Sequence, residues 1–426
     1  MMLMFMRRLL WLIISSLQVL SVANAADYSL GYDAATSYLY TDNVNGSSSD
    51  PVSANAGIVN TGFKVKRTTE NHELDIDLGL DFYDYNIEGY NTQNQDLQIR
   101  DQYRLERHTF TLNAGLVRDS TNTSEEFREQ ADVRTEFSSD RSETSDFSAG
   151  WDYQLTEANR LTLNASRTDI NYDSSDEVGY RSDAYSASIS EIFSETTYVF
   201  LQLNHNTSDS DLNEIFPGLA STQQSSNTDG LALGLNYSPT EQLLFNGYAG
   251  KSTVQTDPNA QDESGFCDTI FADRFPQCFY LQNTQETEVD TTYADIGVTW
   301  TDEVWDVKAG FNRSQQPDSN GELLEYDRWS TSGTYKIDEK NRITASLVYR
   351  LSSGVVPVPG EDPGDRDYWD YSLRWSLQLT QVWSFFSAVN FYESTQPNRA
   401  GGDLVTETWR YSVGISYSPI ASHWSR

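Results

Sequence analysis

Apolar and polar residues alternate strictly between Trp369 and Leu379. One parity reads Trp, Tyr, Leu, Trp, Leu, Leu, and the other reads Asp, Ser, Arg, Ser, Gln. The same alternation returns over residues 383–391, with one serine in the apolar set, and again over residues 409–417. A period of two puts alternate side chains on opposite faces of a β-strand. The pattern therefore predicts strands with one apolar and one polar face.

The same unit recurs along almost the whole chain from Asp27 onward. It is sharpest between Leu74 and Phe82, where five large apolar residues alternate with three aspartates and a glycine. Charged carboxylates require water, whereas large apolar side chains favour a medium without it. Such a strand fits a membrane wall better than the core of a soluble sheet.

The connections between these units alternate between short and long. Short ones have about two to five residues, as at 338–341, while long ones include 209–225, 255–285 and 353–366. Short periplasmic turns and long extracellular loops are typical of bacterial outer-membrane barrels. We therefore expect an all-β fold, a transmembrane antiparallel up-and-down β-barrel of about 18 strands (about 16 to 18), with both ends in the periplasm. The charged stretch 119–146 decides the exact count. A soluble sandwich or propeller is the rival fold, but neither requires this alternation of loop lengths.

The first 25 residues resemble a secretory signal peptide. A cationic pair at Arg7 and Arg8 precedes an apolar run, and a small-residue cleavage site ends at Ala25. A membrane anchor is less favoured because the run is short and contains polar residues. The predicted organisation is a signal peptide (1–25), a barrel (26–418) and a short C-terminal tail (419–426). The tail either folds onto the barrel or extends into the periplasm.

The amino-acid composition indicates which kinds of molecule the protein is suited to contact. The formal charge of −34 disfavours nucleic acid, whose phosphates would be repelled. The 25 Tyr and 10 Trp suit a membrane–water interface. A mean hydropathy of −0.58 is compatible with a barrel, because only alternate side chains of each strand meet lipid. The expected location is the outer membrane of a Gram-negative bacterium, in contact with lipid and lipopolysaccharide.

Two cysteines, Cys267 and Cys278, lie within one long polar insertion. In an exported chain this favours a disulfide that closes a surface loop. A metal pair is the minor alternative, because no His or third Cys lies nearby in the sequence. No zinc spacing, phosphate loop or haem motif is present, so we expect no cofactor and no metal.

One histidine is a candidate catalytic residue. His205 lies near the outer end of a predicted strand, just before Ser208 and Asp209. Outer-membrane hydrolases use a carboxylate, His and Ser at strand tips, but nucleophile–base geometry does not follow from such spacing. We therefore expect a protein that is not an enzyme and has no catalytic residue.

Basic residues fall on positions predicted to face the lumen. In the second half of the chain these are Lys308, Arg328, Lys336, Arg350, Arg374 and Arg410, and earlier ones are Lys64, Arg100 and Arg104. Basic side chains in a pore guide anionic solutes, and Arg binds carboxylates well. The alternative is that they brace the wall by pairing with Asp152, Asp295, Asp306 and Asp370. Both readings remain open.

The strand–turn–strand unit at 151–167, with its Tyr-x-Leu-Thr-Glu turn, resembles outer-membrane barrels from exopolysaccharide biosynthesis loci. The looser unit at 375–391 is similar. The closing Tyr417-Ser-Pro and the Trp-Ser-Arg end at 424–426 are similar to barrels associated with the PEP-CTERM/exosortase system. The resemblance implies a pore that works with a periplasmic polysaccharide-export protein and passes anionic or neutral polysaccharide. It implies no catalytic residues.

Three other functions remain as alternatives. A general or sugar-specific diffusion porin would conduct without a periplasmic partner. A hydrolase centred on His205 would lose its activity when that residue is replaced. A structural barrel would enclose another protein.

Overall fold

The structure is a computed structural model that describes residues 26–120, 141–173, 179–212, 222–259, 287–317, 323–354, 366–397 and 403–425. The predicted signal peptide and the Cys267–Cys278 pair lie outside these residues. No helix in the described residues is long and apolar enough to cross a membrane.

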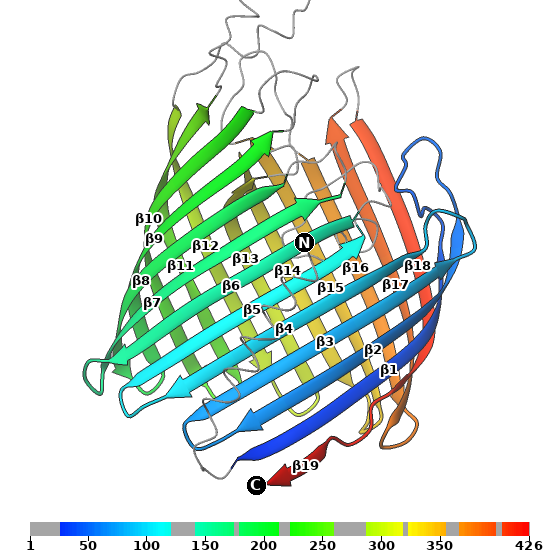
Figure 1. Cartoon of the computed structure of the whole chain (residues 1–426), viewed down its shortest axis with the longest axis horizontal. Coiled ribbons are helices and arrows are strands. Elements are labelled where there is room, and N and C mark those ends of the chain that lie inside the picture. Colours follow the sequence, from blue (N-terminus) through cyan, green and yellow to red (C-terminus); the bar gives the residue numbers. More distant parts are fainter. Residues whose placement is uncertain are drawn as a thin grey trace, which may run out of the picture.

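Nearly all of the described chain is β-strand (Figure 1). The strands are β1 (Asp27–Thr41), β2 (Ala54–Thr68), β3 (His72–Tyr85), β4 (Thr92–Arg104), β5 (His108–Ser120), β6 (Arg141–Gln154), β7 (Asn159–Tyr172), β8 (Tyr180–Ser194), β9 (Thr197–Leu212), β10 (Thr222–Thr240), β11 (Leu243–Asn259), β12 (Thr287–Thr301), β13 (Trp305–Pro317), β14 (Leu323–Lys336), β15 (Asn341–Gly354), β16 (Arg366–Gln378), β17 (Trp383–Pro397), β18 (Asp403–Tyr417) and β19 (Ser422–Ser425).

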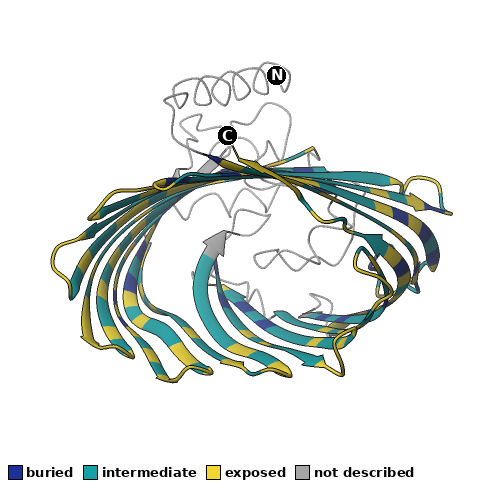
Figure 2. Ribbon diagram, turned by 90° about the horizontal axis from the view of Figure 1, so that it is seen from below, coloured by how far each residue is buried: buried dark blue, intermediate teal, exposed yellow. Residues whose placement is uncertain are grey.

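Strands β1 to β18 form a closed antiparallel barrel. Each pairs with the next in the sequence, and β1 pairs with β18 from Ala34↔Tyr417 to Thr41↔Arg410. Figure 2, seen from below, shows the strands as a wall around the barrel axis. The predicted fold class, the up-and-down order and the count of 18 barrel strands are confirmed.

The strand register divides the side chains into an inward and an outward set. Directly opposed residues in an antiparallel ladder point to the same face, so one assignment extends around the whole barrel. Large apolar side chains such as Leu112, Leu233 and Leu373 share one set and are exposed. The polar set lies on the concave side, where Asn204 of β9 reaches Tyr293 of β12 across two intervening strands. The outer surface is therefore an apolar belt.

Aromatic rings border this belt on both sides. Toward the extracellular loops, ring centroids lie 5.1 Å apart for Phe311–Trp329, 5.3 Å for Trp329–Tyr349, 4.2 Å for Tyr349–Trp369 and 4.6 Å for Phe391–Trp409. Toward the short turns, they lie 4.4 Å apart for Trp305–Tyr335 and 4.7 Å for Trp383–Tyr417. Aromatic girdles mark the two membrane–water boundaries of a transmembrane barrel. The chain is therefore built to span the outer membrane of a Gram-negative bacterium.

The C-terminal tail completes the seam between the first and last strands. Between the pairs Ala34↔Tyr417 and Leu30↔Ser422, β1 spans four residues whereas the C-terminal segment spans five. The extra residue is accommodated around Pro419, which has no N–H to contribute to the ladder. Beyond it, β19 pairs with β1, and Trp424 stacks on Tyr28 at 5.5 Å. The tail folds onto the barrel, which resolves the alternative left open by the sequence.

Short turns fix the hairpin register at the periplasmic end. In the β14–β15 turn, the Asp338 carboxylate accepts hydrogen bonds from the backbone N–H groups of Lys340 (2.7 Å) and Asn341 (2.8 Å). These bonds favour the ionised carboxylate and hold the pKa of Asp338 below its ordinary value. The turn therefore closes the hairpin with a charged side chain that stays in water.

The main apolar cluster lies at the extracellular end. Leu39, Ala56, Ile58 and Tyr85 occupy inward positions of β1, β2 and β3, and Val44 of the first loop packs against them. Asn43 in the same loop donates a 3.0 Å hydrogen bond to the Glu407 carbonyl of β18. The first loop is thus fastened to the inner side of the wall and across the closing seam.

Two adjacent residues of β5 allow a test of which strand positions face lipid and which face the lumen. Leu112 points outward within the apolar belt, while Asn113 points inward and bonds Ser148 at 3.0 Å. We predict that Leu112→Arg lowers the free energy of unfolding by about 2 to 4 kcal/mol, because the charge meets lipid. Asn113→Arg should cost much less, because the lumen is wet. Urea unfolding in lipid vesicles measures both, and equal losses would contradict the assignment.

Candidate functional site

Most of the inner wall falls into three sectors by charge, which are separated from one another by β7, by β12 and by the β1–β18 seam. We define the basic sector as the inward face of β13–β18, with the basic residues Lys308, Arg328, Lys336, Arg342, Arg350, Arg366, Arg374 and Arg410 and the acids Asp306 and Asp370. The acidic sector is the inward face of β1–β6, where acids outnumber bases. Its acids are Asp27, Asp33, Glu73, Asp75, Asp77, Asp81, Asp96, Asp119, Asp146 and Asp152, and its bases are Lys64, Lys66, Arg100 and Arg104.

The third sector carries no charge. Inward positions of β8–β11 whose side chains the structure describes hold small, hydroxyl, amide, aliphatic and aromatic residues only. We call this the neutral sector. Strand order places β4–β6 half a circuit from β13–β15, so these parts of the acidic and basic sectors lie across the lumen from each other, while the two sectors adjoin at the β1–β18 seam. Figure 1 shows β2–β6 at the front and β13–β16 behind them.

The predicted basic residues all occupy inward positions, but their surroundings differ. Lys308 and Arg374 are exposed to the lumen. The Arg374 guanidinium lies 4.1 Å from the centroid of the Phe386 ring on β17, a cation–π contact that orients it. Lys336 lies at the periplasmic rim, where its ammonium donates a 3.0 Å hydrogen bond to the Glu303 carbonyl.

The other three basic residues are more enclosed and lie toward the extracellular end. Arg328 opposes Arg350 in the ladder, and Arg350 and Arg410 are 7% and 5% exposed. Arg350 lies 5.7 Å from the Tyr368 ring, and Arg410 lies 5.7 Å from the Tyr392 ring. These contacts hold the guanidinium groups against the wall instead of extending them into the lumen.

Of the predicted bracing carboxylates, Asp370 has basic neighbours among the predicted residues. Asp370 on β16 interacts electrostatically with Arg350 and Arg328. Asp152 instead accepts a 2.6 Å hydrogen bond from Thr162, and Asp295 accepts one of 3.3 Å from Asn312. Thus Arg328 and Arg350 belong to a structural cluster, whereas Lys308 and Arg374 are available to a solute. A binding role for the six residues stays a prediction.

Carboxylates offset the lysines of the acidic sector. The Lys64 ammonium lies 4.0 Å from Asp77, and that of Lys66 lies 3.7 Å from Asp75 and in contact with Glu73. In both cases the partners belong to neighbouring strands β2 and β3. These lysines therefore add little positive potential, and the wall formed by β2 and β3 remains acidic.

The candidate hydrolytic residues are not brought together. His205 points outward, stacks near Tyr185 and lies 2.8 Å from an Asp229 carboxylate oxygen. Ser208 is three residues away, so the period of two turns it to the inward face, where it is 4% exposed. Within the described residues, no group of three or more His, Cys, Asp or Glu side chains could hold a metal.

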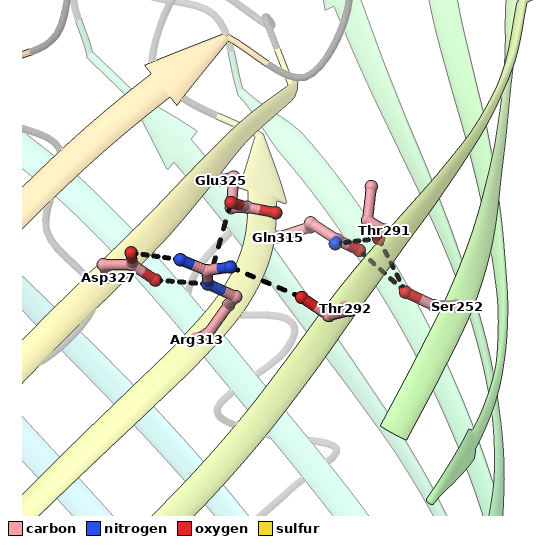
Figure 3. A network of polar contacts seen from close by, with 7 residues as sticks. All are labelled: Ser252, Thr291, Thr292, Arg313, Gln315, Glu325 and Asp327. Atoms are coloured by element: carbon pink, nitrogen blue, oxygen red, sulfur yellow. Dashed lines mark hydrogen bonds and ion pairs between the residues drawn. The ribbon is translucent and has the colours of Figure 1, made fainter. Parts of the chain in front are cut away.

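A polar network replaces the backbone ladder at one seam, and the sequence did not reveal it. Pairing of β12 with β13 ends at Ala294↔Arg313, although both strands continue toward the loops. Across this gap Arg313 donates to Thr292 at 3.4 Å, and Gln315 donates to Thr291 and accepts from Ser252 at 3.4 Å, while Asp327 of β14 holds the Arg313 guanidinium from the other side (Figure 3). Side chains thus join the wall where main-chain hydrogen bonds stop.

Sequence reasoning also missed the neutral sector. Its available signal was aromatic residues at polar positions of the alternation, such as Phe200 on β9 and Tyr248 on β11, with Tyr293 on the adjoining β12. In the apolar–polar pattern of the sequence, an aromatic residue at a polar position is only a break in the alternation and does not indicate a sector of the wall.

No protein-family profile matches the sequence, and no curated protein is similar to it in sequence. Solved structures similar in shape include the FrpB iron transporter of Neisseria meningitidis, with 8% identity, a TM-score of 0.49, and coverage of 92% of this chain and 81% of that one. OpdQ of Pseudomonas aeruginosa has 9% identity, a TM-score of 0.43, and coverage of 92% and 98%. OccAB3 of Acinetobacter baumannii has 8% identity, a TM-score of 0.45, and coverage of 92% and 99%. These likenesses concern barrel shape and carry no argument about cargo.

The exposed bases should influence ion selectivity. We predict that Lys308→Gln with Arg374→Gln shifts the reversal potential of the reconstituted barrel in a KCl gradient toward cation preference, because two lumen charges are lost. The matched control is Arg167→Gln with Arg181→Gln, which removes the same charge from outward positions paired with Asp183 and Asp169. Equal shifts in both variants would contradict a specific role for the basic sector.

Proposed function

We propose that this protein is an outer-membrane channel for the export of exopolysaccharide, a biofilm or capsule polymer made by a flippase-and-polymerase type of pathway. The observation that carries the proposal is the basic sector, in which Lys308 and Arg374 are exposed inside a closed barrel. A periplasmic polysaccharide-export protein would deliver the polymer to the short-turn end.

The chemistry of acidic polysaccharides suits this wall. Their uronate carboxylates recur along the chain, and guanidinium groups bind carboxylates with charge-assisted hydrogen bonds. The contact between Arg374 and Phe386 keeps this guanidinium in place without neutralising it. The acids of β4–β6 on the facing wall would repel the same polymer and direct it toward the basic sector. Passage would be passive, and repeated weak contacts would let the polymer move on.

A general or sugar-specific diffusion porin is the second candidate. A lumen with opposed acidic and basic walls suits small polar solutes as well as a polymer. Such a porin would give a steady conductance in a bilayer without any partner. Deleting its gene would leave polysaccharide secretion intact.

The test is a clean deletion, with polysaccharide measured outside the cell and in the periplasm. We predict loss of extracellular polymer and its accumulation in the periplasm, because the route across the outer membrane is missing. The intact gene and a His205→Ala version should both restore secretion, since His205 points away from the lumen.

Unchanged secretion after deletion would overturn the export proposal and favour the diffusion porin. Failure of the His205→Ala version alone, with normal amounts of folded barrel, would instead revive the hydrolase.

A further inference from the structure

An aromatic group lies at the edge of the neutral sector and extends onto the adjoining strand β12. Phe200, Tyr248 and Tyr293 come from the inward faces of β9, β11 and β12, and we call them the inner aromatic patch. Tyr248 lies between the other two, with ring centroids 6.4 Å from Phe200 and 6.0 Å from Tyr293. Both contacts are edge-to-face, at interplanar angles of 67° and 60°. The three rings therefore form one continuous apolar surface on the inner wall.

Glycines make room for two of these rings. Gly234 on β10 lies between Phe200 and Tyr248 in the ladder, and a Cβ there would be 2.0 Å from the Phe200 ring. A Cβ on Gly230 would be 2.9 Å from the Tyr293 ring. Glycine within a strand often marks the close approach of another group. Here it lets the rings lie over the backbone of β10, so they cover the wall instead of projecting across the lumen.

Amide groups border the patch. The Asn204 amide donates a 2.9 Å hydrogen bond to the Tyr293 hydroxyl, and the Gln202 amide donates one of 2.6 Å to the Asn204 side-chain oxygen. This chain fixes the Tyr293 ring across β10 and β11. It also places amides and a phenol, which can both donate and accept hydrogen bonds, next to apolar ring surface.

We propose that the inner aromatic patch, with Gln202 and Asn204, is a binding site for the uncharged sugar rings of a polysaccharide. The apolar C–H face of a pyranose suits an aromatic surface, while its hydroxyl groups match neutral amides and phenols. The described inward positions of β8–β11 carry no charge, and the Asp295 carboxylate on β12, which opposes Tyr248 in the ladder, can accept hydrogen bonds from sugar hydroxyls, so these surroundings fit a neutral sugar ligand. This inference rests on the proposed function only in taking polysaccharide as the cargo.

The neutral and basic sectors would then act on different parts of one polymer. The basic sector would attract carboxylates, and the inner aromatic patch would contact sugar rings between them. Because no single contact is strong, a sliding chain could exchange one ring for the next. A general diffusion porin without sugar specificity would not need such a surface.

The test uses the purified full-length barrel in detergent, with maltohexaose, cellohexaose and isomaltohexaose as probes and polyethylene glycol of similar size as the negative probe. Calorimetry should detect binding of at least one hexasaccharide and none of the glycol. Tyr248→Leu and Tyr293→Leu should each weaken that binding about tenfold, because each removes a ring contact.

The matched control is Tyr185→Leu, which removes an outward-facing aromatic ring from β8. It should bind like the wild type. A heat-modifiable shift on electrophoresis verifies that every variant is folded. Gly234→Ala is a second route, since a methyl group there displaces the Phe200 ring without removing it, and it should also weaken binding.

Two results would overturn the inference. One is failure of the folded wild type to bind any of the three hexasaccharides, and the other is unchanged binding in both tyrosine variants. Neither affects the deletion experiment. Loss of secretion on deletion without sugar binding would leave the export function standing, with the inner aromatic patch serving only to fill the wall.

Discussion

In the hydrocarbon core of a bilayer, every peptide N–H and C=O must find its partner within the protein. Pairing of β1 with β18 meets this requirement, because it removes the two edges that an open sheet would expose to lipid. The tail strand β19 extends the seam beyond the point where β18 leaves it. Closure also separates the lumen from the membrane. The alternate side chains of each strand are therefore divided between a lumen-facing set and a lipid-facing set.

That division lets the two surfaces serve different purposes. The outward set supplies the apolar belt and its aromatic girdles, and the inward set is free to vary from strand to strand. It varies by sector, with an acidic wall, a neutral wall and a basic wall. A protein with a formal charge of −34 can therefore present Lys308 and Arg374 to an anionic polymer, because the acids that face the lumen lie mainly outside the basic sector.

Local periodicity was sufficient to predict the strands, the barrel and the inward positions of Arg374 and Lys308, because each depends on residues a few positions apart. It even separates His205 from Ser208, whose spacing of three puts them on opposite faces. Contacts that span several strands were out of reach. The bond from Asn204 to Tyr293 and the end of the β12–β13 ladder depend on curvature and register across the barrel. The neutral sector combines four strands, so no single stretch of sequence displays it.

The most direct test of the central claim, that polymer passes through the lumen, is photo-crosslinking in secreting cells. A photoreactive residue at Ser372 would face the lumen, and one at Leu373 would face lipid. Barrels isolated after illumination would be probed for covalently attached polysaccharide. The account predicts attachment from position 372 and none from position 373. Polymer attached from neither position, or equally from both, would contradict it.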